Sequence, residues 1–391
     1  MKKIIHYIFK RECAFLFRRK KSRAFFVFIY PLIIVGCLFY IFSAESLTQI
    51  PVGVVDDGQG AASREMKRVL QANQFLNIFS FPSLPTAFKA LRRGEVYGVV
   101  ALDENYDKNL AKRTGAEISA WVNNEYLLVG GNLSKGLNAA VGAVNNRYQR
   151  KNLAALGIAP ALWESFSAPL QVSEKVLYNP AINYLYFLGM GLVPAVFQLF
   201  ICMSICYSLL WDIKTRHIRQ LQHSYMLHPF AAVGTKLGFY IGAYFGEMVI
   251  VLAVLVLGFE LPVQGSLIRI MAGILAFLFL TAATALGIAG CSNNLRLGLS
   301  ICAMYSAPAF AYYGVSFPVQ SMPVPARIWA ECMPGTHLNR IFVNEFLRGA
   351  DGLGSWWNIL FMVILGLLLF WAGAWGYNRW VKQSTYWGPQ L

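Results

Sequence analysis

The sequence alternates between long apolar runs and polar segments. Six runs reach the roughly 20 apolar residues that a helix needs to cross a bilayer. They cover about residues 24–44, 182–210, 234–258, 267–291, 297–317 and 356–378. This pattern predicts an α-helical polytopic membrane protein with six transmembrane helices, and an apolar region of five helices over residues 181–391.

Residues 2–22 show a different pattern, with apolar and basic positions at helical spacing. Ile5, Phe9, Cys13 and Leu16 fall on one face, and Lys10 lies on another. A basic helix of this kind lies in the headgroup plane of a membrane. We therefore expect an amphipathic interfacial helix over residues 1–23, with a disordered basic tail as the alternative.

Residues 45–180 form the one sizeable hydrophilic region. Short β-branched or aromatic runs predict strands, and amphipathic segments between them predict helices. The strands are expected over 50–58, 75–81, 97–104 and 116–124, and the helices over 63–73, 83–96, 105–113 and 126–155. The alternation predicts a small α/β domain inserted between the first two spans.

Charge placement orients the chain. The sequence has a net charge of +15 with only 14% charged residues, and basic residues crowd the N-terminus before the first span. Such residues flank the cytoplasmic end of a first span, so we expect both termini in the cytoplasm and residues 45–180 outside it. A nucleic-acid patch is disfavoured because an apolar span follows at once. A cleaved signal peptide is disfavoured because the span exceeds the usual 7–15 apolar residues.

Motifs for chemistry are missing from the sequence. GxxxxGK[ST], GxSxG and HExxH do not occur, and the seven cysteines show no zinc or disulfide spacing. Asp56-Asp57-Gly58 fits a turn after a strand better than a metal site. We therefore expect no catalytic residue, no metal and no cofactor bound by this chain.

One predicted span carries a glycine repeat and a lone acid. Gly234, Gly238, Gly242 and Gly246 recur every four residues, a spacing that lets helices approach closely in lipid. Glu247 lies beside them, and an acid in a span usually faces a partner or water. A packing seam is the simpler interpretation of the glycines. Glu247 is either a structural contact or a ligand for an ion or substrate.

The most specific stretch is GVSFPVQSMPVPARIWAECMPGTHLNRIFVNEFLRG, residues 314–349. It resembles a pattern of ABC-2 type permeases, the membrane subunits of type V ABC exporters. Within that family it is similar to a bacterial multidrug or linearmycin-like subgroup with a large extracytoplasmic domain between the first two spans. The residues that carry the resemblance are Phe317, Pro318, Met322, Pro323, Trp329, Pro334, Arg348 and Gly349.

The resemblance implies roles for several residues. Residues 318–350 would form short re-entrant helices at an outer gate made by Phe317, Pro318, Met322, Pro323 and Pro334. Pro318 and Pro323 would end the fifth span, and Pro334 would break the hairpin. The segment 211–233 would be a coupling helix that contacts an ATPase. Asp212, Leu221 and Pro229 fit its outline loosely, whereas Arg216 and Arg219 depart from it.

The resemblance also implies partners and a function. Two permeases, identical or related, would pair in the bacterial cytoplasmic membrane with a cytoplasmic ABC ATPase dimer, which would bind ATP and Mg²⁺. The complex would export a drug, a lipid or another amphipathic envelope compound, with or without a periplasmic adaptor. The alternative is a non-transporting sensor or scaffold whose extracytoplasmic domain binds a ligand or an envelope partner.

Overall fold

The computed structural model describes residues 2–17, 21–43, 48–112, 116–125, 127–160, 163, 183–349 and 351–388. The chain divides into two compact units. One unit contains Met1–Ser43 and Leu177–Leu391, and the other contains Ala44–Val176. We describe each unit separately.

The unit of residues 44–176 contains a four-stranded sheet in the order β2-β1-β3-β4. The strands are β1 (Ile50–Asp56), β2 (Leu76–Phe81), β3 (Gly98–Leu102) and β4 (Ile118–Val122). β1 pairs in parallel with β2 and β3, whereas β4 runs antiparallel to β3. Every strand lies within a segment where the sequence predicts one.

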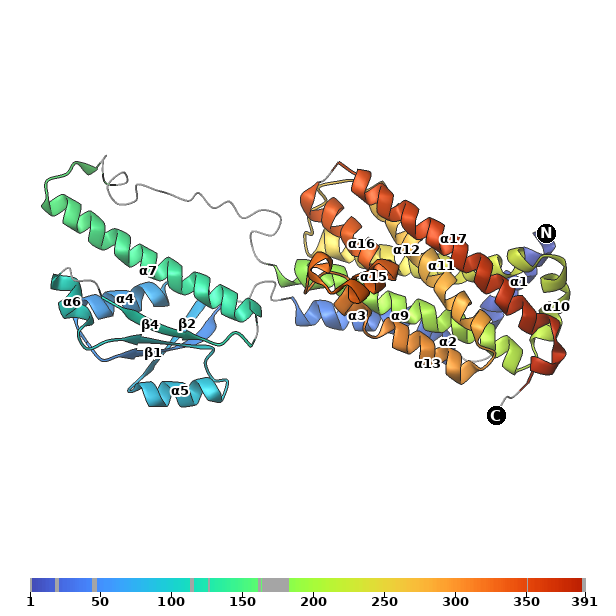
Figure 1. Ribbon diagram of the computed structural model, residues 1–391, viewed down its shortest axis with the longest axis horizontal. Helices are drawn as coiled ribbons and strands as arrows, with labels where there is room; N and C mark the ends of the chain where they lie inside the picture. Colours follow the sequence, from blue (N-terminus) through green and yellow to red (C-terminus); the bar gives the residue numbers. More distant parts are fainter. Residues whose placement is uncertain are drawn as a thin grey trace. The chain divides into compact units, whose positions relative to one another are not determined.

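Helices cover both faces of this sheet, because successive side chains of a strand point to opposite sides. Val52 and Val54 of β1 face α4 (Ala61–Gln71) and α7 (Leu127–Ala155), whereas Val55 faces α5 (Leu84–Arg92). The short helix α6 (Tyr106–Lys112) lies on the α4 side. The result is a three-layer α/β/α arrangement, with α4 and α7 on one side and α5 on the other (Figure 1).

The other unit is helical. Among the described residues, five helical segments are long and apolar enough to cross a membrane, as expected of a polytopic helical membrane protein. They are Ser22–Ile41, Tyr184–Lys214, Pro229–Gly258, Leu267–Cys291 and Leu353–Lys382. The first comprises α2 (Lys21–Ala24), the π-helix η1 (Phe25–Ile29) and α3 (Tyr30–Ile41), and the third comprises α11 (Pro229–Ala253) and the π-helix η3 (Val254–Gly258). The others are α9 (Tyr184–Lys214), α12 (Leu267–Cys291) and α17 (Leu353–Lys382).

The fifth predicted span, residues 297–317, is wrong as a single helix. The structure has α13 (Leu295–Ser306) and then α14 (Ala309–Tyr312), with the break next to Pro308. Proline has no N–H to continue a helical ladder. The 12 residues of α13 span only about 18 Å at 1.5 Å per residue, short of the roughly 30 Å hydrocarbon core.

Short helices follow this break. They are the 3₁₀-helix η4 (Val319–Ser321), α15 (Val324–Cys332), α16 (Pro334–Phe342) and the π-helix η5 (Val343–Arg348). Pro318 and Pro323 immediately precede η4 and α15, and Pro334 is the first residue of α16. Proline is favoured there because its φ suits a first turn and its missing N–H is not needed. Pro318 and Pro323 therefore start short helices, and the helix they were expected to end has already stopped.

Two further helices occupy one end of the helical unit. α1 (Lys2–Phe17) and α10 (Ile218–Leu227) lie at the end where α17 finishes, whereas α9 begins at the opposite end (Figure 1). The expected N-terminal helix is thus present over Lys2–Phe17. The segment 211–233 contains the last turn of α9, the whole of α10 and the first turn of α11.

Glycines bring α12 and α17 into close contact. A Cβ added to Gly290 would lie 2.7 Å from the Gly373 carbonyl oxygen, and one added to Gly373 would lie 2.8 Å from the Gly287 nitrogen. A Cβ on Gly376 would lie 2.8 Å from the Gly290 oxygen. Backbone therefore touches backbone along this pair of helices, as small residues permit in lipid.

Candidate functional site

Four charged side chains from three helices form a buried cluster. Arg11 and Glu12 come from α1, Asp212 from α9 and Lys236 from α11. Glu12, Asp212 and Lys236 are each only 1% exposed. Lys236 Nζ lies 2.5 Å from Asp212 Oδ2 and 3.4 Å from Glu12 Oε1. The Arg11 guanidinium forms two hydrogen bonds to the Asp212 carboxylate, one of them 3.1 Å long.

Neutral groups complete the cluster. The Ser208 hydroxyl donates to Glu12 Oε2 at 2.9 Å, and the Tyr240 hydroxyl donates to the same oxygen at 3.2 Å. Lys236 Nζ also donates to the Ser208 carbonyl oxygen at 3.0 Å. Two carboxylates thus face two cations, and neutral hydroxyl and carbonyl groups supply further hydrogen bonds. A buried ion cluster needs such bonds to offset the cost of removing its charges from water. The cluster fixes α1 against α9 and α11.

The residues predicted for ATPase coupling separate into two groups. Asp212 and Leu221 are buried, so their side chains hold the helical unit together. Arg216 and Arg219 are exposed, and Pro229 is half-buried as the first residue of α11. Arg216 adopts a left-handed backbone conformation with φ of 57°, and this turns the chain from α9 into α10. The structure therefore exposes only the two arginines.

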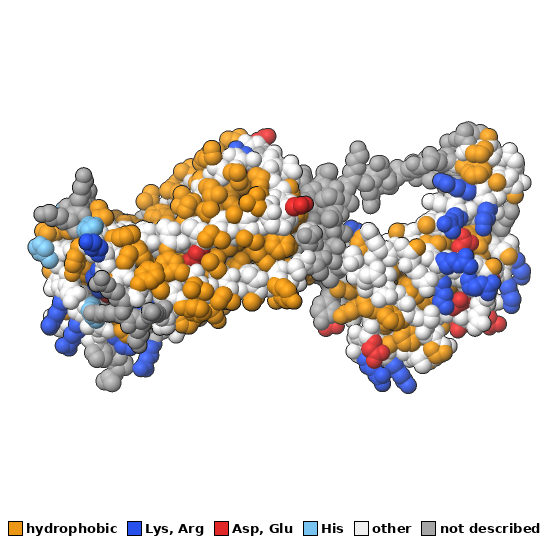
Figure 2. All heavy atoms as spheres, turned by 180° about the vertical axis from the view of Figure 1, so that it is seen from behind, with side chains coloured by type: hydrophobic (Ala, Val, Ile, Leu, Met, Phe, Trp, Pro, Cys, Tyr) orange, Lys and Arg blue, Asp and Glu red, His pale blue; other side chains and the backbone are white. Residues whose placement is uncertain are grey.

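Exposed apolar side chains lie at the other end of α10 and at the start of α11. Met226, Leu227 and Phe230 are 50%, 54% and 44% exposed. Lys, Arg and His side chains gather at the end of the unit that carries α1 and α10, whereas hydrophobic side chains cover its long sides (Figure 2). A surface that mixes exposed apolar and basic side chains suits a protein contact.

A cavity of about 610 Å³ lies in the helical unit beside α1, η1 and α9. Its walls are mostly aromatic and aliphatic, and Arg23 is its charged lining residue. The Arg23 guanidinium carbon lies 4.1 Å from the centre of the Phe15 ring and 4.7 Å from that of the Trp211 ring. One of its nitrogens, Nη1, is buried and has no hydrogen-bond partner among the described residues. The cavity therefore combines an apolar volume with a single cation.

The residues predicted for an outer gate differ in their exposure. Phe317 is 51% exposed, Pro318 and Pro323 are exposed, and Met322 is half-buried. Pro334 is buried. Pro318 lines a cavity of about 390 Å³ together with Asn339 and Arg340. The exposed and buried members thus lie in different surroundings.

α16 is held firmly in the helical unit. A Cβ added to Gly335 would lie 1.9 Å from the Tyr313 ring, so only glycine fits there. The Tyr313 hydroxyl donates to Gln198 Oε1 of α9 at 2.7 Å. The Arg340 guanidinium pairs with Glu331 at 2.8 and 2.5 Å, and this hydrogen-bonded pair holds the pKa of Glu331 below its ordinary value. α15 and α16 are thereby tied to each other and to α9.

A second ion pair fixes the segment that follows α16. The Glu345 carboxylate, which is fully buried, accepts hydrogen bonds from Arg269 Nε at 2.7 Å and Nη2 at 2.8 Å. It also accepts one from the Ser266 backbone N–H at 2.8 Å. Burial alone would raise the pKa of Glu345, but these donors hold it below its ordinary value. Gly349 ends η5 with a φ of 60°, a left-handed conformation that favours glycine.

Three of the predicted packing glycines have no neighbour within the described chain. Gly238, Gly242 and Gly246 are exposed, and an added Cβ would meet nothing within 4 Å. A Cβ added to Gly234 would lie 3.7 Å from the Phe370 ring. Glu247 is 4% exposed, and both its carboxylate oxygens lack hydrogen-bond partners among the described residues.

Sequence reasoning missed Arg11, Glu12 and Lys236 as partners of Asp212. A signal was present, because Glu12 is the only acid in the first 44 residues and Lys236 interrupts an apolar run. Over the described residues, no group of three or more His, Cys, Asp or Glu side chains could hold a metal ion.

A comparison with protein families finds one model that spans most of the chain. It is described as ABC-2 family transporter protein, and it matches residues 21–375. The match includes the first span, both units and most of α17. A comparison with curated proteins finds no match.

Proposed function

The chain belongs to the ABC-2 family of transporter proteins, and from this premise we propose that it is the membrane subunit of an ATP-driven exporter. The family places a permease in the membrane, and the apolar helices agree with a multi-pass membrane protein. ATP hydrolysis then belongs to a separate ATPase. ABC-2 permeases generally work with such subunits.

In this proposal two cytoplasmic ATPases dock on the α10 surface and on α1. The observation that carries it is the buried cluster of Arg11, Glu12, Asp212 and Lys236, which joins α1 to α9 and α11. The cluster would thereby couple a movement of α1 to α9 and α11, the two apolar helices that flank α10 in the sequence. Exposed Arg216 and Arg219 supply the cationic part of the docking surface.

The complex pairs with a second permease, identical or related. The exposed stripe of Gly238, Gly242 and Gly246 supports a close helix contact, since nothing among the described residues covers it. The exported molecule is a drug, a lipid or another amphipathic envelope compound. The apolar cavity beside Arg23 supports this substrate class. The protein lies in the bacterial cytoplasmic membrane with both termini in the cytoplasm.

The test is stimulation of a candidate ABC ATPase by this chain. The full chain is purified with that ATPase, and ATP turnover is compared with and without it. Arg216→Glu and Arg219→Glu are expected to lower the stimulation, whereas Lys382→Glu, which changes an exposed lysine at the end of α17, is the matched control. An ATPase that neither binds the chain nor responds to it would instead favour a sensor or scaffold.

A further inference from the structure

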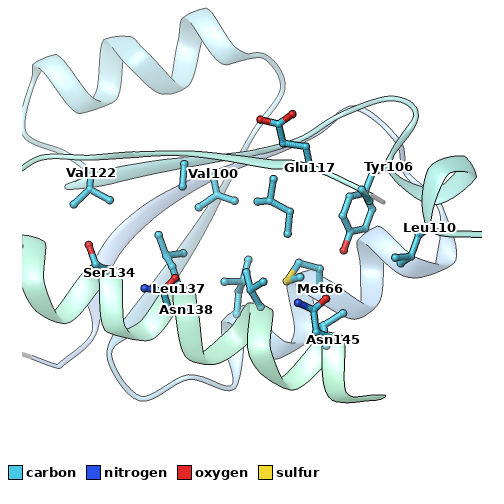
Figure 3. Close-up of a pocket in the computed structure, with 16 residues that line it drawn as sticks. Met66, Val100, Tyr106, Leu110, Glu117, Val122, Ser134, Leu137, Asn138 and Asn145 are labelled. Carbon is cyan, nitrogen blue, oxygen red and sulfur yellow. The ribbon is translucent and has the colours of Figure 1, made fainter. Parts of the chain in front are cut away.

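The α/β unit contains a large cavity of its own. Its volume is about 620 Å³, and it lies between the β3–β4 side of the sheet and α7, with side chains of α4 and α6 also in its lining (Figure 3). The lining includes small side chains from both sides: Ala120 of β4, Ala116 just before β4, and Ser134 of α7. The gap between sheet and helix therefore stays unfilled where large side chains would close it.

The walls of this cavity are mainly apolar. Met66, Val100, Leu137 and Val141 are among the lining residues, together with Leu70 and Ile118. Protein interiors are normally close-packed, and an open apolar volume of this size is unusual in a small unit. Small-molecule sites typically measure about 300–1,000 Å³ and are apolar with few polar groups. The cavity matches that description.

Polar groups lie at defined places in the cavity. Tyr106 is 3% exposed, and its hydroxyl points into the cavity among the labelled side chains (Figure 3). Burial raises the pKa of Tyr106 to about 12, so the hydroxyl keeps its proton and can donate. Asn138 and Asn145 of α7 are exposed at the opening. These groups can form hydrogen bonds with the polar end of a ligand whose body lies against the apolar wall.

The charge of the lining restricts the ligand further. Glu117 is the charged residue among those that line the described cavity, and no Lys or Arg side chain is part of this lining. Its carboxylate lies on the other side of the strand from the apolar side chains and points away from the cavity (Figure 3), and Glu117 is exposed. The described lining therefore directs no charged group into the cavity, and a charged ligand head would find no opposite charge there.

We propose that this cavity binds a small, uncharged amphipathic molecule. The apolar body of the ligand lies between β4 and α7, and its polar head lies near Asn138 and Asn145. The volume is too small for a helix of another protein, which is about 10 Å wide over its whole length. This site lies outside the helical unit and does not depend on ATP-driven export.

Photolabelling of the full chain tests the proposal without any ATPase. Three probes share a dodecyl chain with a photoactivatable diazirine and differ only in the head: hydroxyl, trimethylammonium or sulfate. Labelled peptides are identified by mass spectrometry. Labels on β4 and α7 report the cavity, and labels on the helical unit show that each probe reached the protein. The hydroxyl probe is expected to label the cavity more strongly than the two charged probes, because the described lining directs no charged group into the cavity to pair with either charged head.

Two substitutions on one strand form a matched pair. Ala120→Trp fills the cavity, whereas Ser119→Trp places the same side chain on the other face of β4, because neighbouring residues of a strand alternate. Ala120→Trp is expected to abolish the cavity label, and Ser119→Trp is expected to keep it. Glu117→Lys changes an exposed side chain that points away from the cavity, and it is expected to leave the cavity label unchanged.

The outcomes separate clearly. Equal labelling of the cavity by all three probes in the unmodified chain would overturn the proposed preference for an uncharged ligand. A cavity label that persists in Ala120→Trp would overturn the site. If Ala120→Trp does not fold, the comparison of the three probes in the unmodified chain decides.

Discussion

Lys236→Met is the sharpest test of the buried charge cluster. Methionine keeps most of the length of the lysine side chain but removes the ammonium group. That group lies 2.5 Å from Asp212 Oδ2 and 3.4 Å from Glu12 Oε1, and Lys236 is 1% exposed. After the substitution, two buried carboxylates share one guanidinium, that of Arg11. Removing one partner of a buried pair typically costs about 3–5 kcal/mol, because the remaining charge is left unpaired.

A second substitution should recover part of this loss. In Lys236→Met combined with Asp212→Asn, Arg11 and Glu12 remain as one cation facing one anion, 3.3 Å apart. The double variant should therefore be more stable than the sum of the two single losses predicts, by about 1–3 kcal/mol. Lys382→Met is the control, since Lys382 is exposed at the end of α17.

Unfolding of the full chain in dodecylmaltoside by added SDS measures these differences through tryptophan fluorescence. Eight of the ten tryptophans, all except Trp121 and Trp163, belong to the helical unit, so the signal follows that unit. A Lys236→Met variant within about 1 kcal/mol of the unmodified chain would refute the reasoning, because a loss that small is typical of an exposed pair. Purely additive single losses in the double variant would refute the pairing between Lys236 and Asp212.

Three further predictions follow from the helical unit. Gly290→Val should prevent normal folding, because its Cβ would lie 2.7 Å from backbone, whereas Gly242→Val should leave monomer stability nearly unchanged; both are measured by size-exclusion chromatography after heating. Glu247→Met should stabilise the isolated chain by about 1–3 kcal/mol in the same SDS titration, since a buried acid without hydrogen bonds is replaced by an apolar group. Glu345→Gln should flatten the acid side of a plot of melting temperature against pH. Because the pKa of Glu345 in the folded chain lies below its ordinary value of 4.5, the ion pair stabilises the fold at pH values above 4.5. This stability is lost as the pH falls through the folded pKa, so an unchanged acid limb would contradict the role of this ion pair.

Local patterns were sufficient to predict most elements. β1 over Ile50–Asp56 follows from a β-branched run closed by Asp and Gly, and α12 over Leu267–Cys291 follows from an unbroken apolar run of the right length. The prediction of one continuous helix over residues 297–317 failed for a local reason that hydropathy does not include. Pro308 adds to the apolar character of the segment, yet it removes a backbone donor and coincides with the end of α13.

Partner choice was harder to predict, because it depends on helices that are far apart in the sequence. Asp212 was assigned to ATPase contact from its place in a segment, although its carboxylate pairs with Arg11, 201 residues away, and with Lys236. The glycine spacing in α11 suggested close packing, yet the contact between backbones lies at Gly290 and Gly373, where the spacing is irregular. Periodicity identifies a face of a helix, but it does not identify which helix that face meets.

Lone charges in apolar segments are informative for the same reason. A charge in such a segment is costly unless it is paired, so its presence implies a partner even when the sequence does not identify it. Asp212 and Lys236 meet this expectation inside the chain, and Arg269 meets it through Glu345. Glu247 does not meet it among the described residues. The rule therefore separates the paired charges that build this helical unit from Glu247, whose role must be sought in what the unit binds.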